Sequence, residues 1–179
     1  MEFFTLFTKK FLRYILKPLS FIPALVMMYF IISFSTQTGA ESGSLSYEVS
    51  KIIILAYNKL LFKGYDNMTL NELIALIHPY VRKTAHITEY FLLAASISFP
   101  LYVYRIRGFA LTLLAGAFCV GFACLDEYHQ TFVSGRVGTV HDVFIDSIGI
   151  LIGIIAVRIV GFIGRKTIFS FLSLDENRR

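Results

Sequence analysis

The chain has 179 residues, of which 56% are hydrophobic and 16% are charged. Soluble globular domains average roughly 45–50% apolar and about 25% charged residues, so the composition excludes a disordered chain and favours a membrane protein. The formal net charge is +5, but the Lys and Arg residues lie in separate stretches and form no continuous stripe, which argues against a nucleic-acid partner.

Four segments are long and apolar enough to cross a bilayer as helices, which takes about 20 apolar residues. In chain order they cover residues 19–36, 87–104, 108–125 and 143–164. The first follows a basic stretch and has an alternative interpretation as a signal peptide, but its apolar run exceeds the roughly 7–15 residues of such a segment. The sequence therefore predicts an all-α membrane protein with a four-span transmembrane helix bundle, in a single domain over residues 1–179.

The distribution of Lys and Arg predicts the orientation of these spans, because cytoplasmic loops carry more of both residues than outer loops. Eleven lie on the side of the two termini, namely Lys9, Lys10, Arg13, Lys17, Arg105, Arg107, Arg158, Arg165, Lys166, Arg178 and Arg179. Six lie on the other side, namely Lys51, Lys59, Lys63, Arg82, Lys83 and Arg136. We therefore expect a multi-pass protein of the cell membrane with both termini in the cytoplasm, and with residues 37–85 and 126–141 facing outward.

The outward segment between the first two spans contains a predicted amphipathic helix. Its apolar residues recur at helical spacing before a stop at Gly64, and they are Leu45, Val49, Ile52, Ile53, Ala56, Leu60 and Leu61. Such a helix lies on the outer leaflet of the membrane or, alternatively, packs on the bundle as a core helix. Further on, Thr69-Leu-Asn-Glu72 has the form of a capping box, and Pro79 starts or kinks the helix that continues into the second span.

Ionisable side chains gather at the outer ends of the second, third and fourth spans, where a charge is costly and therefore a functional candidate. Three groups have helical spacing: Arg82, His86 and Glu89, then Asp126, His129 and Gln130, and finally Asp142 and Asp146. Arg136 lies in the loop between the last two groups. The sequence therefore predicts one polar cluster at the outer face. The alternative is that Asp142 or Asp146 forms a structural ion pair with Arg82 or Arg136.

Small residues in the last two spans predict close helix packing below this cluster. Gly149 and Gly153 form a GxxxG pair in the fourth span, and Ala117 and Gly121 form a similar pair in the third. Because such pairs let two helix backbones approach closely, we expect the third and fourth spans to pack against each other there.

The polar residues form an ordered pattern along the chain. Arg82-Lys83-x-x-His86-x-x-Glu89-Tyr90 is followed by Asp126-Glu127-x-His129-Gln130, Arg136 and Asp142, and Phe34-Ser35-Thr36-Gln37 closes the first span. This pattern resembles the VanZ-like family from about residue 33 to residue 153. The resemblance implies a multi-pass bacterial membrane protein whose namesake is linked to teicoplanin resistance, with no settled reaction or cofactor. At Asp146 many members of that family are expected to carry Asn, so this chain has an extra acid there.

Two functions compete on this pattern. In the first, the protein binds or modifies a membrane lipid or a lipid-linked cell-envelope precursor at the outer face and contributes to glycopeptide tolerance. The residues expected to hold an anionic head group are Arg82, Lys83, Gln130 and Arg136. Gly135 and Gly138 would let the loop backbone approach that group.

In the second, the protein is a membrane-embedded hydrolase or transferase, and its candidate catalytic residues are His86, Glu89, Asp126, Glu127 and Asp142. His86 or His129 would act as a base that Glu89 or Asp126 orients. A divalent metal held by carboxylates and imidazole is a variant of this hypothesis, but the i, i+3 spacing of His86 and Glu89 is not diagnostic, so no metal ligand or cofactor is assigned. A transporter is disfavoured because no inverted repeat is visible in the four spans.

Overall fold

The computed structural model describes residues 17–166, and these residues form helices and no β-strand. In chain order the helices are α2 (Ile22–Ser35), α3 (Gly39–Leu60), α4 (Asn67–Val103), α5 (Gly108–Gln130) and α6 (Val140–Lys166). Within the described range the predicted all-α class is therefore confirmed. Five of the basic residues that contribute to the predicted orientation lie outside the described residues, namely Lys9, Lys10, Arg13, Arg178 and Arg179.

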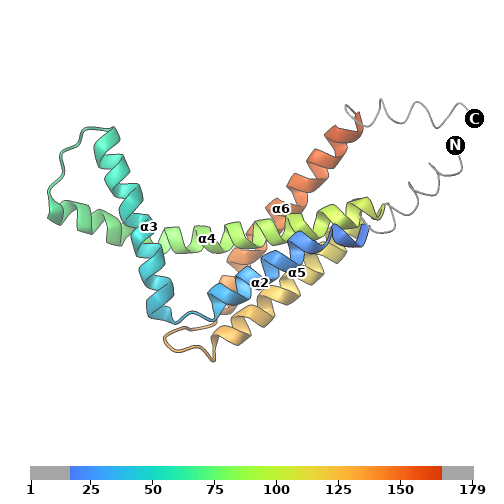
Figure 1. Ribbon diagram of the computed structural model, residues 1–179, viewed down its shortest axis with the longest axis horizontal. Helices are drawn as coiled ribbons and strands as arrows, with labels where there is room; N and C mark the ends of the chain where they lie inside the picture. The colour runs from blue at the N-terminus through green and yellow to red at the C-terminus, as the bar shows by residue number, and fades with distance from the viewer. Residues whose placement is uncertain (1–16, 167–179) are drawn as a thin grey trace, which may run out of the picture.

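Helices α2, α4, α5 and α6 pack together as a bundle, while α3 crosses the N-terminal part of α4 at a steep angle (Figure 1). The start of α2, the turn between α4 and α5, and the end of α6 point to the same side of the bundle. The α2–α3 connection and the α5–α6 loop lie at the opposite end. They touch there, because the Gly39 N–H donates to the Ser134 carbonyl oxygen over 3.0 Å.

The core of the bundle is apolar along most of its length and becomes polar at that second end. Leu93, Cys119 and Ile154 are among its buried residues. On α5 the buried positions recur every three to four residues, as expected for one face of a helix, and the last of them are Asp126, Glu127 and Gln130. The same face of α5 therefore supplies both the hydrophobic core and the polar residues above it.

Three of the described helices are long and apolar enough to cross a membrane, namely Lys17–Ser35, Gly108–Gln130 and Val140–Ile163. They contain the first, third and fourth predicted spans, with small shifts of the boundaries. The second predicted span, residues 87–104, is not among them. The helix that contains this segment ends at Val103. The segment already includes Glu89, and a full-length span would also have to include His86, which makes the span less apolar.

The start of α4 differs from the prediction. Asp66 is the N-cap residue, because its carboxylate accepts a hydrogen bond from the Thr69 N–H at 3.3 Å. The predicted capping box from Thr69 to Glu72 is therefore wrong. Pro79 does not start a helix either, since α4 runs through it without a break.

α3 begins with a capping box that was not predicted. The Glu41 N–H donates to Thr38 Oγ1 at 3.3 Å, and the Thr38 N–H donates to Glu41 Oε2 at 2.9 Å. The bond from the Thr38 N–H, and after it the bond from the Thr38 hydroxyl, holds the pKa of the Glu41 carboxyl below its usual value. The box fixes the first turn of α3 next to the α5–α6 loop.

α3 contacts α4 through one face. Its residue Ile54 packs with Leu70 and Ile74 of α4 in a second, smaller core. His78 of α4 adds polar contacts, because its Nε2 lies 2.8 Å from Ser46 Oγ. A helix at this place in the sequence is therefore confirmed.

Most of the predicted apolar stripe of α3 is left uncovered by the described residues. Leu45, Val49, Ile52, Ile53 and Leu60 are between 46% and 75% exposed. A core helix of the bundle would bury such side chains, which are worth about 1.5–3 kcal/mol each when fully buried. α3 thus presents a large apolar surface next to the bundle.

The GxxxG pair of α6 packs against α4 and not against α5. A Cβ atom on Gly149 would lie 2.2 Å from the Ile87 carbonyl oxygen, and one on Gly153 would lie 2.5 Å from the Phe91 carbonyl oxygen. On α5, Gly121 has no such neighbour within 4 Å. The predicted close approach is therefore real, but the expected partner helix is wrong, since α5 turns Gly121 outward.

Candidate functional site

A cavity of about 700 Å³ opens between α2, α3 and α4 at the polar end of the bundle. Its apolar lining residues come from α2, α3 and α4 and include Ile31, Leu45, Val49, Ile53 and Leu92. Its polar lining residues include Arg82, His86, Glu89, Asp126, Gln130 and Arg136. The volume falls in the range of small-molecule sites, about 300–1,000 Å³, and the lining suits an amphipathic ligand.

A buried hydrogen-bond network at the end of α5 forms one edge of this cavity. The Gln130 amide nitrogen donates to Asp126 Oδ2 at 3.1 Å and to Glu127 Oε1 at 3.2 Å. The Tyr90 hydroxyl of α4 donates to the same Asp126 oxygen at 3.3 Å. Because a buried carboxylate is costly unless it is hydrogen-bonded, this network explains how α5 can carry two acids on its inner face.

Arg136 ties the α5–α6 loop to the C-terminal end of α2. Its Nε donates to the Gln37 carbonyl oxygen at 2.8 Å, and its Nη2 donates to the Phe34 carbonyl oxygen at 2.7 Å. Its Nη1 donates to Gln130 Oε1 at 3.1 Å. The carbonyl groups at a helix C-terminus lack partners within the helix and attract a cation, so the sequence Phe34 to Gln37 acts here through its backbone.

The surroundings of Arg136 disfavour the charged form of its side chain. Burial lowers the pKa of the Arg136 guanidinium, and the positive charge of Arg82 lowers it further. The guanidinium nevertheless remains charged, since arginine does not lose its proton in proteins. Two cations therefore lie near each other at the edge of the cavity.

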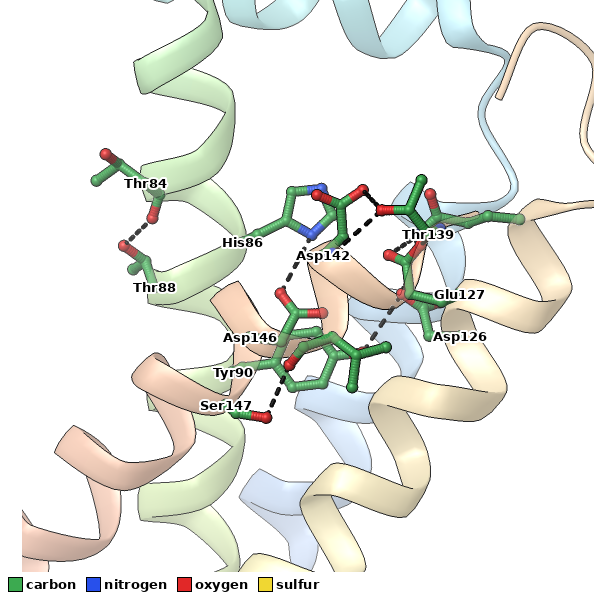
Figure 2. Close-up of polar contacts among 12 residues, drawn as sticks. Thr84, His86, Thr88, Tyr90, Asp126, Glu127, Thr139, Asp142, Asp146 and Ser147 are labelled. Carbon is green, nitrogen blue, oxygen red and sulfur yellow. Dashed lines mark hydrogen bonds and ion pairs between the residues drawn. The ribbon is translucent and has the colours of Figure 1, made fainter. Parts of the chain in front are cut away.

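A second polar group lies between α4 and α6. His86 of α4 and Asp146 of α6 point toward each other, with 3.5 Å between Nδ1 and Oδ1 (Figure 2). That distance is longer than a hydrogen bond of ordinary length. The Asp146 side chain is completely buried, and neither of its oxygens has a hydrogen-bond partner among the described residues.

Glu127 of α5 completes this group. His86, Glu127 and Asp146 each offer one atom that could bind a metal ion, and these atoms lie within 4.8 Å of one another. Glu127 Oε2 accepts a hydrogen bond from the Thr139 N–H at 2.9 Å. The three residues come from three different helices, so no local spacing in the sequence brings them together.

Arg82 and Glu89 line the cavity without partners. Neither side chain forms a hydrogen bond or an ion pair with residues 17–166. Glu89 lies one turn along α4 from His86, and its side chain is only partly exposed. Both groups therefore remain available to a ligand.

Other predicted site residues lie apart from the cavity. Lys83 and His141 are exposed and are not among its lining residues. His129 is also exposed, with its Nδ1 3.4 Å from Ser35 Oγ. Asp142 Oδ2 accepts a hydrogen bond from Thr139 Oγ1 at 2.9 Å at the start of α6, so Asp142 belongs to a helix N-terminus and not to the cavity wall.

The alternative of structural ion pairs with arginine does not hold among the described residues. Asp146 lies against His86, and Asp142 binds Thr139. The loop glycines also act differently from the expectation. A Cβ atom on Gly138 would lie 2.0 Å from the Glu127 carbonyl oxygen, and Gly135, with φ 71°, packs against Gly39. Both glycines bring the loop close to the protein itself.

Two features of the site were missed in the sequence. Thr139 stands three residues before Asp142, which is the spacing of an N-cap residue and its partner. The role of Thr139 at the start of α6 could therefore have been predicted from the sequence. The group of His86, Glu127 and Asp146 could not be predicted, because it depends on how three helices are rotated and shifted against one another. The roles assigned to the predicted catalytic and binding residues stay predictions.

The fold and the site define a helical membrane protein that carries a polar network at one end of its bundle, beside an amphipathic cavity. The VanZ/LLP1 family model matches residues 20–161 of the chain. The match covers more than half of the chain, which therefore belongs to the VanZ/LLP1 family. No curated protein and no solved structure matches it significantly.

Proposed function

We propose that this protein binds a lipid-linked, anionic component of the cell envelope in the cavity between α2, α3 and α4, and that it contributes to teicoplanin tolerance in this way. The observation that carries the proposal is the combination of an apolar wall with a cation that has no hydrogen-bond or ion-pair partner in the described part of the chain. Arg82 supplies this cation, and Leu45, Val49 and Ile53 supply part of the wall.

The chemistry of Arg82 favours a phosphate head group. Guanidinium groups bind phosphate through paired, charge-assisted hydrogen bonds, which are worth about 1.5–3 kcal/mol each. Arg82 lies close enough to Arg136 for its positive charge to lower the pKa of the Arg136 guanidinium. An anion near both guanidinium groups would relieve the repulsion between them.

The apolar surface of α3 supports a place for the cavity at the outer leaflet. An amphipathic helix can lie in the membrane interface with its apolar face in the acyl region, and the exposed residues of α3 include Ile52 and Leu60. In this position the hydrocarbon chain of a ligand would pass from the bilayer into the cavity along α3, while its head group would stay near Arg82.

The proposal includes a four-span topology in which α4 is the second span and both termini are cytoplasmic. The start of α2, the turn between α4 and α5, and the end of α6 lie on one side of the bundle, and the basic residues Lys17, Arg105, Arg107 and Arg158 belong to that side. The cavity would then face outward, where teicoplanin meets lipid-linked precursors.

Lipid binding can be tested on full-length protein purified in mild detergent. Native mass spectrometry should detect a bound anionic lipid, and the Arg82→Gln variant should bind it about 10–150-fold more weakly, which is the equivalent of losing 1.5–3 kcal/mol. Lys83→Gln is the matched control. It removes the same charge one residue away, from a side chain outside the cavity, and should keep wild-type binding.

The same pair of variants tests the biological part of the proposal. In bacteria that depend on this chain for teicoplanin tolerance, Arg82→Gln should reduce tolerance at unchanged abundance in the membrane, and Lys83→Gln should not. Equal lipid binding by wild type and Arg82→Gln, or an equal effect of Arg82→Gln and Lys83→Gln, would overturn the assignment of the cavity as the binding site.

A further inference from the structure

Asp146 is buried in a way that calls for a positively charged partner. Its side chain has no exposed surface, and both of its oxygens lack a hydrogen bond among the described residues. An isolated buried carboxylate costs far more than a neutral polar group. Buried charges in proteins are paired or bind metal ions, and the nearest candidate partner, His86, lies too far for an ordinary hydrogen bond.

The spacing of the three residues fits metal ligation better than a direct hydrogen bond. Two ligand atoms held about 2.0–2.2 Å from a tetrahedral zinc ion lie about 3.3–3.6 Å from each other. The distance between His86 Nδ1 and Asp146 Oδ1 is 3.5 Å. The ligand atom of Glu127 lies within 4.8 Å of both, which leaves room for one ion between the three side chains.

The charge balance at this end of the bundle also favours a cation. This end of the bundle holds two guanidinium groups, those of Arg82 and Arg136, and five carboxyl groups, those of Glu89, Asp126, Glu127, Asp142 and Asp146. Arg136 is already engaged with Gln130 and with the backbone at the end of α2. A divalent ion beside Glu127 and Asp146 would neutralise two carboxylates that form no ion pair with an arginine among the described residues.

Glu127 is oriented in the manner of a metal ligand. Its Oε2 accepts the Thr139 N–H at 2.9 Å, and its Oε1 accepts the Gln130 amide at 3.2 Å. Ligating carboxylates are typically held by hydrogen bonds of this kind, which fix their direction before the ion binds. The backbone at Gly138 packs directly on the Glu127 carbonyl and keeps Thr139 in place.

We propose that His86, Glu127 and Asp146 bind one divalent transition-metal ion such as Zn²⁺ between α4, α5 and α6, beside the cavity. Three protein ligands leave a further coordination position open, and His86 itself lines the cavity. The imidazole favours zinc and its neighbours in the first transition series over Mg²⁺ and Ca²⁺, which prefer oxygen ligands alone. This inference does not depend on the proposed binding of a lipid.

The first test measures metal content in full-length protein purified in detergent without a polyhistidine tag. Elemental analysis after dialysis should find about one transition-metal ion per chain. After removal of the metal by EDTA, Zn²⁺ should raise the midpoint of thermal unfolding, because an ion that binds only the folded state stabilises it. Mg²⁺ at the same concentration should have little effect.

The second test uses two substitutions on the same helix. Asp146→Asn places the residue expected in many VanZ-like proteins, so the variant should fold. It should weaken Zn²⁺ binding more than about 100-fold, since loss of a mere supporting hydrogen bond already costs 10–100-fold. Asp142→Asn is the control, because Asp142 is one turn away and binds Thr139 instead.

Two results would overturn the metal site. One is wild-type protein that binds no Zn²⁺ and shows no thermal shift, which would leave a proton shared by His86 and Asp146 as the explanation of their contact. The other is equal Zn²⁺ binding by wild type, Asp146→Asn and His86→Gln. Arg82→Gln should keep its metal, so failure of the metal site and failure of the lipid site are separate outcomes.

Discussion

Arg136 illustrates how one side chain can hold several parts of this molecule. Its three nitrogens each donate to a different acceptor, and the acceptors belong to the end of α2, the connection that follows it, and α5. Phe34 and Gln37 contribute only their carbonyl groups, so their side chains are free for other contacts. Arg82, by contrast, is a cation of the same type that has no hydrogen-bond or ion-pair partner within residues 17–166. This difference is why we assign Arg136 a structural role and propose a binding role for Arg82.

We therefore expect Arg136→Ala to destabilise the protein. The substitution removes the Arg136 donor from the Gln130 side-chain oxygen and the Gln37 carbonyl oxygen, and an unsatisfied buried polar group costs about 1–3 kcal/mol. The Phe34 carbonyl oxygen keeps the Gln37 N–H as a donor. Thermal or denaturant unfolding of the purified protein would measure the loss. Lys83→Ala, an exposed site, should stay within about 0.5 kcal/mol of wild type. Equal stability of the two variants would contradict a structural role for Arg136.

At the scale of residues, the sequence pattern indicated which positions carry polar chemistry but not how they are connected. Helical spacing placed Asp126 and Gln130 on one face, and they are hydrogen-bonded there. It also grouped Asp142 with Asp146, although Asp142 is bonded to the capping residue Thr139 and Asp146 is buried against α4. Spacing along one helix does not identify the residue that a side chain contacts on another helix, since this contact depends on how both helices are rotated about their axes.

The packing of α6 on α4 is the contact that sets this rotation. Gly149 and Gly153 meet the backbone of α4 at Ile87 and Phe91, and Asp146 lies one turn before them on the same helix. His86 stands directly before Ile87 in the sequence. The close approach of the two backbones therefore determines where His86 and Asp146 meet, and the glycines serve the site as well as the fold.

Gly149→Ala should accordingly destabilise the bundle and disturb the contact between His86 and Asp146. The added methyl group would lie 2.2 Å from a backbone oxygen, and such overpacking typically costs about 1–3 kcal/mol. Gly121→Ala is the matched control on α5, because nothing lies within 4 Å of that position. It should be neutral or stabilising by up to about 1 kcal/mol, the gain in helix propensity. Unfolding midpoints of the two variants decide between these outcomes.

The existence of most helices was predictable from apolar runs, whereas their ends and partners were less so. The apolar spacing of residues 45–61 correctly indicated a helix. The predicted capping box at Thr69 is wrong for the helix after it, because the N-cap is Asp66, three residues earlier. The sequence also suggested a partnership of the third and fourth spans through small residues. Small residues identify a surface that can be approached closely, but they do not identify the helix that approaches it.

Residues 17–166 combine three clearly apolar helices, α2, α5 and α6, with α3 and with a longer helix of mixed character, α4. α4 reaches from the contact with α3 to the opposite end of the bundle (Figure 1), and it carries Arg82, His86 and Glu89 along its middle. If α4 is the second span, these polar residues face the cavity and α6 instead of lipid, which would lower the cost of placing them in the membrane. The mixed composition of α4 is thus a consequence of its position beside the site.

The number of spans determines on which sides of the membrane the two termini lie. Three spans would put them on opposite sides, whereas a fourth span formed by α4 returns the chain to the side from which it started. We expect four spans and cytoplasmic termini, because the basic residues are concentrated on the side of Lys17, Arg105 and Arg107. A fluorescent protein fused after Arg179 should then fold and fluoresce, and a periplasmic phosphatase at that position should be inactive. The same phosphatase inserted at Lys63, in the exposed connection between α3 and α4, should be active. Phosphatase activity at both Lys63 and Arg179 would show that α4 does not cross the membrane. Activity at Arg179 alone would reverse the topology and remove the outward orientation on which the proposed encounter with lipid-linked precursors depends.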